Sequence, residues 1–97
     1  MDLRVAEVLE ATAHPNADRL LVLKLKVGEE VRQVVAGIRA AYDPAALVGR
    51  RVVLLANLAP AVLRGVESQG MLMAADDAGK PVLLRPDTDV PSGTRVR

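Results

Sequence analysis

The segment from residue 57 to residue 73 contains closely spaced polar residues that could bind a ligand or take part in catalysis. An asparagine and a proline follow an apolar run, an arginine precedes a glycine, and Glu-Ser-Gln-Gly-Met comes next. Proline fixes φ and lacks an N–H group, while glycine permits positive φ or the close approach of another backbone. Such a backbone holds a small set of polar groups in one place. The segment therefore predicts a rigid binding loop that presents Asn57, Arg64, Ser68, Gln69 and Met71.

Ser68 suggests a hydrolase, because the chain also contains a histidine and several acids. A nucleophile elbow requires glycine two residues before the serine, and Val66 stands there instead. A domain of this size also leaves little room for a triad in a cleft. One histidine and no cysteine make a zinc site unexpected. We therefore expect no enzyme, no catalytic residues, no metal, no cofactor and no small-molecule substrate.

The length and composition bound the class of protein. The 97 residues correspond to one domain, 1–97. The lack of cysteine fits a reducing compartment. No apolar run approaches the roughly 20 residues needed to cross a bilayer, and the first residues do not resemble a signal peptide. We expect a cytoplasmic domain without a membrane partner.

The net charge of +1 conceals an uneven distribution. Residues 19–64 carry eight basic and three acidic side chains, whereas residues 1–18 and 65–97 are both net acidic. A basic middle of this kind is typical of a nucleic-acid footprint. An ordinary solvated surface with ion pairs explains the same pattern, and charge alone favours that simpler explanation.

Short runs of valine and leucine predict strands rather than helices in a chain whose single aromatic residue is Tyr42. The clearest run is 21–27, where leucines alternate with lysines as in a half-buried strand. Asp43, Pro44 and Gly49 mark the cap, the first position and the end of one short helical turn. The expected strands are 3–11, with a bulge where the pattern shifts at Val8, then 21–27, 31–36, 50–56 and 70–75, followed by short strands at 81–84 and 94–96.

Five strands with a small helix between the third and fourth have the order of the OB-fold, a five-stranded Greek-key barrel. On the pattern alone, a generic small barrel or sandwich fits as well. The expected fold class is all-β: a five-stranded OB-fold barrel with a short helix between strands 3 and 4 and extra C-terminal strands.

Two motifs in fixed order, His14-Pro-Asn-Ala-Asp18 and Ser68-Gln-Gly-Met71, lie within a set of matching segments that also includes 2–5, 35–38, 47–49, 57–58, 63–65 and 90–94. The chain resembles the tRNA-binding domain family: free-standing structure-specific tRNA-binding proteins and the C-terminal domain of bacterial methionyl-tRNA synthetases. The resemblance implies an OB barrel, tRNA as the partner, and a homodimer formed through the C-terminal region 76–97. Either a free-standing protein or a synthetase domain is consistent with it.

Arg64 is the best candidate for a phosphate contact, because its neighbours fix its position and its planar guanidinium suits phosphate oxygens. The resemblance implies that Ser68 and Met71 lie on the tRNA-contacting surface, although Met71 could equally pack in the core. Asn57 could contact RNA or cap the turn after the fourth strand. The segment 14–18 is expected to be a rigid turn rather than a ligand site. Further positive charge near the RNA, or ordinary solvated side chains, would come from Arg19, Arg32, Arg39 and Lys24.

Two features bear on the mode of binding. Ala59, Ala61 and Val62 stand where the family usually has lysines, which lowers the expected electrostatic attraction. OB-folds that read single strands rely on aromatic stacking, about 1–3 kcal/mol per base, and this chain has neither Phe nor Trp. We therefore expect tRNA to be bound by backbone path and shape, largely independently of sequence, in support of aminoacylation or tRNA handling. The alternative is a peptide-binding module like the CsaA chaperones.

Overall fold

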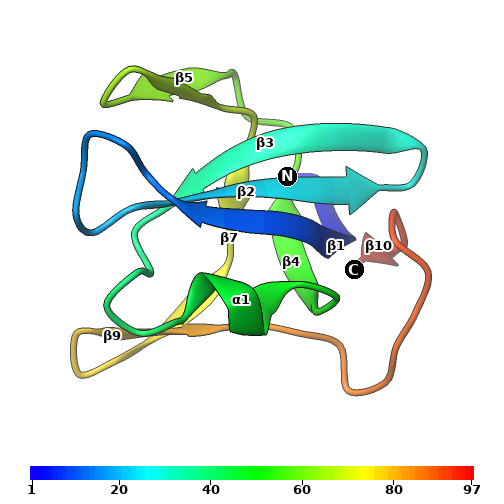
Figure 1. The fold of residues 1–97 in the computed structure, drawn as a ribbon. Coiled ribbons are helices and arrows are strands. Elements are labelled where there is room, and N and C mark those ends of the chain that lie inside the picture. Colours follow the sequence, from blue (N-terminus) through cyan, green and yellow to red (C-terminus); the bar gives the residue numbers. More distant parts are fainter.

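Antiparallel strands form a curled sheet that makes up most of the molecule (Figure 1). The computed structural model describes all 97 residues, and its main sheet has the order β3-β2-β1-β4-β7, with β10 paired to β1. The expected all-β class and OB-like barrel are confirmed, as is a short helix between the third and fourth strands. The elements of this part are β1 (Leu3–Ala13), β2 (Leu21–Val27), β3 (Glu30–Ala36), α1 (Pro44–Leu47), β4 (Arg51–Leu55), β7 (Met71–Leu72) and β10 (Arg95–Val96).

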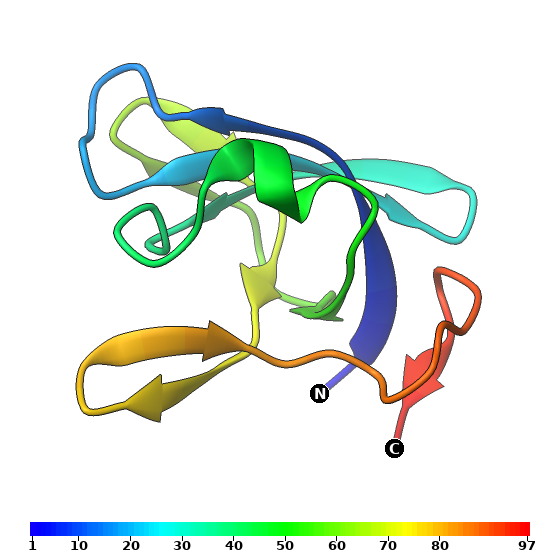
Figure 2. The same ribbon diagram turned by 60° about the horizontal axis from the view of Figure 1, so that its bottom comes forward.

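Strand β1 belongs to both halves of the barrel. Its residues 7–13 pair with β2, its residues 3–7 pair with β4, and Leu3 and Arg4 also pair with β10. The register with β2 shifts between Val8 and Glu10, which confirms the predicted bulge. A bulge bends its strand and increases the local twist. This lets β1 curve from one half of the barrel to the other (Figure 2).

The core inside the curled sheet is built from aliphatic side chains. The predicted alternation in β2 is confirmed by the burial of its leucines and of Val27. Strand β4 buries consecutive residues on both faces, as its continuous apolar run predicted. In α1, the Asp43 carboxylate accepts a hydrogen bond from the N–H of Ala45 at 3.1 Å, so Asp43 is the predicted cap. The largest fully buried side chains are Leu21, Leu23, Leu25, Leu47, Leu54, Val8, Val34 and Val52.

The prediction of one strand over 70–75 is wrong. The segment is divided into β7, which pairs with β4, and β8 (Ala74–Asp77), which pairs with β9 (Lys80–Leu83) outside the main sheet. Met73 lies between them: its N–H donates to the carbonyl of Val53 at 2.9 Å, and its carbonyl accepts from the N–H of Leu84 at 3.1 Å. Because Met73 is bonded in both directions, the chain leaves the barrel there and forms the β8–β9 hairpin. The two expected C-terminal strands, 81–84 and 94–96, correspond to β9 and β10, and β8 is an additional strand.

The helix α1 has four residues, and no helix of the structure is long and apolar enough to cross a membrane.

Candidate nucleic-acid interface

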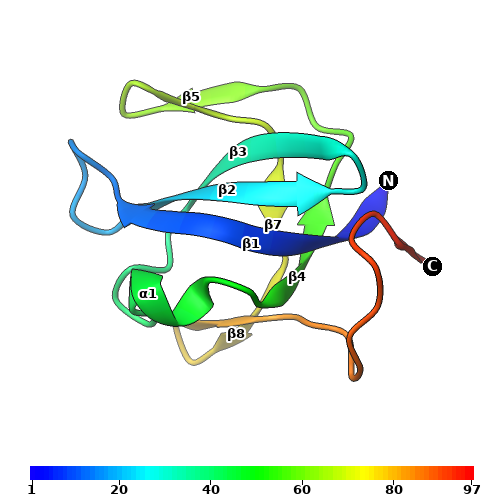
Figure 3. The same ribbon diagram turned by 45° about the vertical axis from the view of Figure 1, so that its right-hand side comes forward.

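A β-hairpin that the sequence did not predict carries Arg64 at its tip (Figure 3). Strands β5 (Ala61–Leu63) and β6 (Val66–Ser68) pair only with each other, and Arg64 and Gly65 connect them. Both connecting residues have positive φ, 53° and 87°, as a two-residue type I′ turn requires. This conformation is unfavourable for arginine by roughly 1–2 kcal/mol, so the surrounding structure holds it there. The Arg64 side chain is exposed and forms no ion pair within the protein.

The turn between β1 and β2 is attached to this hairpin through His14, which is 4% exposed. Nε2 of His14 lies 3.0 Å from the carbonyl oxygen of Leu63, and Nδ1 accepts the N–H of Asn16 at 2.9 Å. The N–H of His14 donates to the carbonyl of Leu20 at 3.0 Å and closes the turn. The turn is therefore the rigid structural element that the sequence predicted, with a buried histidine at its centre.

Arg19 and Arg39 lie beside this turn. The N–H of Arg39 donates to the carbonyl of Arg19 at 3.4 Å, and its guanidinium donates to the carbonyl of Asp18 at 3.4 Å. Both residues are exposed. Figures 1 and 3 place this turn and the tip of the β5–β6 hairpin at the same end of the barrel. We call the group formed by Arg19, Arg39 and Arg64 the basic end.

Ser68 is 4% exposed, and its hydroxyl is used within the fold. Its Oγ accepts the N–H of Val35 in β3 at 2.9 Å and donates to the carbonyl of Gly70 at 3.0 Å. The single hydrogen of the hydroxyl is therefore used within the fold, and its oxygen already accepts one bond there. Ser68 thus attaches β6, and with it the β5–β6 hairpin, to β3.

Gln69 has a comparable structural role. Its N–H donates to the carbonyl of Gln33 at 2.7 Å, and its Oε1 accepts the N–H of Gln33 at 2.9 Å. The side chain of Gln33 in turn donates to the carbonyl of Glu67 at 2.8 Å. These bonds fix the end of the hairpin along the edge of β3.

The remaining predicted polar residues have hydrogen-bond or ion-pair partners within the protein. Lys24 donates to Oε1 of Gln33 at 2.6 Å. Arg32 donates to the carbonyl of Ala56 at 2.5 Å and forms an ion pair with Glu30 at 3.2 Å. Oδ1 of Asn57 accepts the N–H of Asp2 at 2.9 Å, so its amide joins the end of β4 to the N-terminus. These three side chains contribute to the fold at the positions where the sequence predicted RNA contacts.

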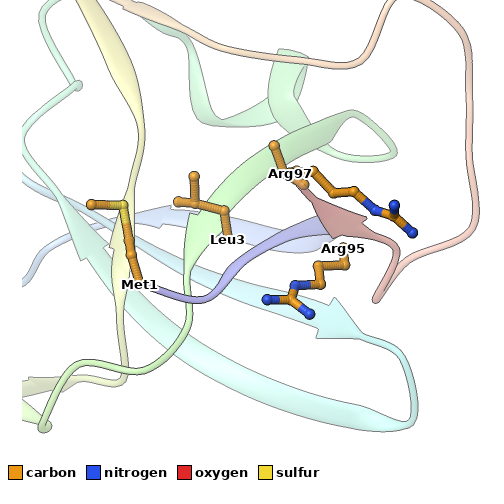
Figure 4. Close-up of a pocket in the computed structure, with 5 residues that line it drawn as sticks. Met1, Leu3, Arg95 and Arg97 are labelled. Atoms are coloured by element: carbon orange, nitrogen blue, oxygen red, sulfur yellow. The ribbon is translucent and has the colours of Figure 1, made fainter.

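Met71 is not packed in the core, since its side chain is 54% exposed. The strand registers place Met71 in a row that crosses four strands. Met71 in β7 lies opposite Leu55 in β4, Leu55 lies opposite Leu3 in β1, and Leu3 lies opposite Val96 in β10. The neighbouring row, Leu54 and Leu72, is buried in the core, so the row of Met71 lies on the outer face of the sheet. Next to it is a hollow of about 560 Å³ lined by Met1, Leu3, Arg95, Val96 and Arg97 (Figure 4). We call Met71, Leu55, Leu3 and Val96 the outer apolar row.

Sequence reasoning missed two features of this region. It did not find the β5–β6 hairpin, because Arg-Gly lacks the asparagine or aspartate that usually marks a type I′ turn. It did not find the link from His14 to Leu63, which joins residues 49 positions apart. The available signal was a histidine before proline in a chain with no other histidine.

Comparison with known proteins agrees with this geometry. Residues 3–95 match the family described as "Putative tRNA binding domain". The chain is 59% identical over 98 residues to a methionine–tRNA ligase of Deinococcus radiodurans; the match covers 100% of this chain and 14% of that protein. The chain therefore spans about a seventh of the length of this relative.

Two crystal structures have the same fold. A MetRS-related protein from Pyrococcus horikoshii is 35% identical, with a TM-score of 0.92, over 99% of this chain and 89% of that one. The chaperone CsaA from Bacillus anthracis is 31% identical, with a TM-score of 0.88, over 99% of this chain and 90% of that one. The description of the matching family is that of a binding domain. The chain belongs to the tRNA binding domain family.

Proposed function

We propose that this chain binds tRNA through its basic end, recognises backbone path and folded shape rather than sequence, and so assists aminoacylation or tRNA handling. The observation that carries the proposal is the placement of Arg19, Arg39 and Arg64 on rigid turns at one end of the barrel. Guanidinium groups held in this way suit the oxygens of successive phosphates. The proposal places the protein in the cytoplasm, with tRNA as its partner.

The only aromatic residue supports recognition of shape rather than of bases. The hydroxyl of Tyr42 accepts the N–H of Leu83 at 3.0 Å, and the guanidinium of Arg50 lies 6.0 Å from the centre of its ring. Its ring is thus occupied within the fold and is not presented to a nucleotide. Without an aromatic platform, base-specific reading of a single strand has no stacking contribution.

The test compares equilibrium binding of bulk tRNA, several purified tRNAs and an unstructured RNA of the same length. We expect similar dissociation constants for the different tRNAs and a clearly weaker one for the unstructured RNA. Equal affinity for the unstructured RNA would refute recognition of shape.

We further propose a homodimer that buries the outer apolar row and involves the C-terminal region 76–97. Val96 of β10 is part of the row, and the adjacent Met1 and the C-terminal Leu84 are exposed at 87% and 43%. Apolar side chains gathered on an outer sheet face mark an interaction surface. Because Met71 belongs to this row, we assign it to the dimer contact rather than to tRNA. Sedimentation at micromolar concentration should give the mass of a dimer, and a monomer would refute this assignment.

A second candidate function is peptide binding, in view of the similarity to the CsaA chaperone. It is favoured by the exposed apolar side chains on and before β5, where Val62, Leu63 and Leu58 are exposed at 68%, 40% and 41%. A gel shift with tRNA and a fluorescence assay with apolar peptides, performed on the same protein, distinguish the two functions. Peptide binding without tRNA binding would favour the second.

A further inference from the structure

The β5 half of the β5–β6 hairpin has little to hold it against the barrel. The β6 half is bound to β3 through Ser68, Gln69 and the side chain of Gln33. Every residue of β5 is exposed. The one hydrogen bond that joins β5 or the turn residues to another part of the barrel is the contact between Leu63 and His14. Apart from its pairing with β6, the β5 side of the tip is therefore hydrogen-bonded to the rest of the barrel only through the side chain of His14.

The two hydrogen bonds of His14 determine which ring nitrogen carries the proton. Because Nδ1 accepts the N–H of Asn16, the proton of the neutral ring is on Nε2, which donates to the carbonyl of Leu63. The ring is buried, so water does not compete well for either bond. His14 thus connects the turn that carries Arg19 with the hairpin that carries Arg64.

We propose that His14 is a positioning residue: its Nε2–H bond to Leu63 fixes the tip of the hairpin, so that Arg64 is held at a set position relative to Arg19 and Arg39. This inference rests on the proposed binding of tRNA. A rigid ligand is recognised by shape only if the contacting groups are held apart at fixed distances. Without the bond, part of the binding free energy is spent on ordering the hairpin.

Two variants separate the bonds of His14. In His14→Asn, the Oδ1 atom takes the place of Nδ1 and accepts the N–H of Asn16, but the side chain is too short to reach Leu63. In His14→Gln, the terminal N–H group takes the place of Nε2–H and reaches Leu63, but the acceptor for Asn16 is lost. Each variant loses one hydrogen bond, so a purely structural role would weaken both alike.

We expect His14→Gln to bind tRNA within about twofold of the wild type, and His14→Asn to bind roughly fivefold more weakly, as for the loss of one hydrogen bond. In the free proteins, amide exchange of residues 61–68, followed by NMR, should accelerate in His14→Asn and stay unchanged in His14→Gln. Equal tRNA affinity of the two variants, or unchanged exchange in His14→Asn, would overturn the positioning role.

A measurement on the wild type keeps the inference testable if a variant does not fold. Long-range ¹H–¹⁵N spectra of the histidine ring should show the proton on Nε2, and a proton on Nδ1 would overturn the proposed bond. If the wild type does not bind tRNA while the exchange of the variants differs as expected, the proposed function fails and the attachment of the hairpin by His14 is supported.

Discussion

Gln69 and Gln33 form a reciprocal pair of hydrogen bonds, in which the side-chain oxygen of Gln69 takes the place of a backbone carbonyl beside strand β3. Two residues further along β3, the N–H of Val35 donates to the hydroxyl of Ser68. Side chains after and within β6 thus satisfy two N–H groups, those of Gln33 and Val35, on the last strand of the main sheet. An unpaired edge strand would otherwise expose these donors to other chains.

Ser68→Ala should lower the free energy of unfolding. The variant leaves the N–H of Val35 without an acceptor in a buried position, a loss of about 1–3 kcal/mol. Urea denaturation measures the change. Ser68→Thr retains a hydroxyl and serves as the control, and an alanine variant as stable as the wild type would show that the bond contributes nothing.

Arg64→Asn should separate stability from binding. Asparagine tolerates positive φ better than arginine, so the free energy of unfolding should stay the same or rise by up to about 1 kcal/mol. The melting temperature should accordingly stay the same or rise. The affinity for tRNA should fall about fivefold or more, because the charged contact is removed. Thermal unfolding and filter binding give the two values. Arg85→Asn, at another exposed arginine, should leave the affinity unchanged; an Arg64→Asn protein that binds normally would place the contact surface elsewhere.

The salt dependence should report the number of phosphates contacted by the basic end. Three contacts predict a slope of log affinity against log salt of about −2 to −3, from roughly −0.7 to −0.9 per phosphate. Removing the charges of Arg19 and Arg39 in a double alanine variant should bring the slope to about −1. Titrations between low and moderate salt give the slopes, with Lys80→Ala as the control. A slope that does not change in the double variant would exclude both arginines from the contact.

Met71→Lys should disrupt the proposed dimer. It places a charge in the outer apolar row, where burial against a second copy would leave that charge without a partner. Sedimentation velocity should then show a monomer, with an unchanged circular dichroism spectrum. Val62→Lys also introduces a lysine at an exposed apolar position, on the hairpin and outside the row, and should remain dimeric. A dimer that survives Met71→Lys does not use this row.

The sequence predicted the parts of the fold that depend on local pattern. The alternation in β2, the cap at Asp43 and the bulge after Val8 are each visible within a few residues. The hairpin around Arg64 was not predictable, because its turn is stabilised by contacts with distant segments rather than by favourable turn residues.

The candidate site was predictable in location but not in detail. The segment 57–73 was recognised from its residue types, and Arg64 is exposed there as expected. The polarity of Ser68, Gln69 and Asn57 gives no indication of whether the partner is RNA or the protein's own backbone. The structure shows partners within the protein that the sequence could not indicate, because they come from distant segments: β3 for Ser68 and Gln69, and the N-terminal segment for Asn57.

The pairing of β1 with β10 has a consequence for the order of folding. Leu3 lies opposite Val96, and the N–H of Val5 donates to the carbonyl of Thr94. Strand β1 therefore cannot complete its pairing until the residues of β10, at the far end of the domain, have been translated. Contacts over such sequence separations slow folding, because a long loop must close before they form. The barrel should accordingly close after synthesis of the domain rather than during it. Until then, the edge of β1 that pairs with β10 stays unpaired, and it is the surface at which the nascent chain needs protection.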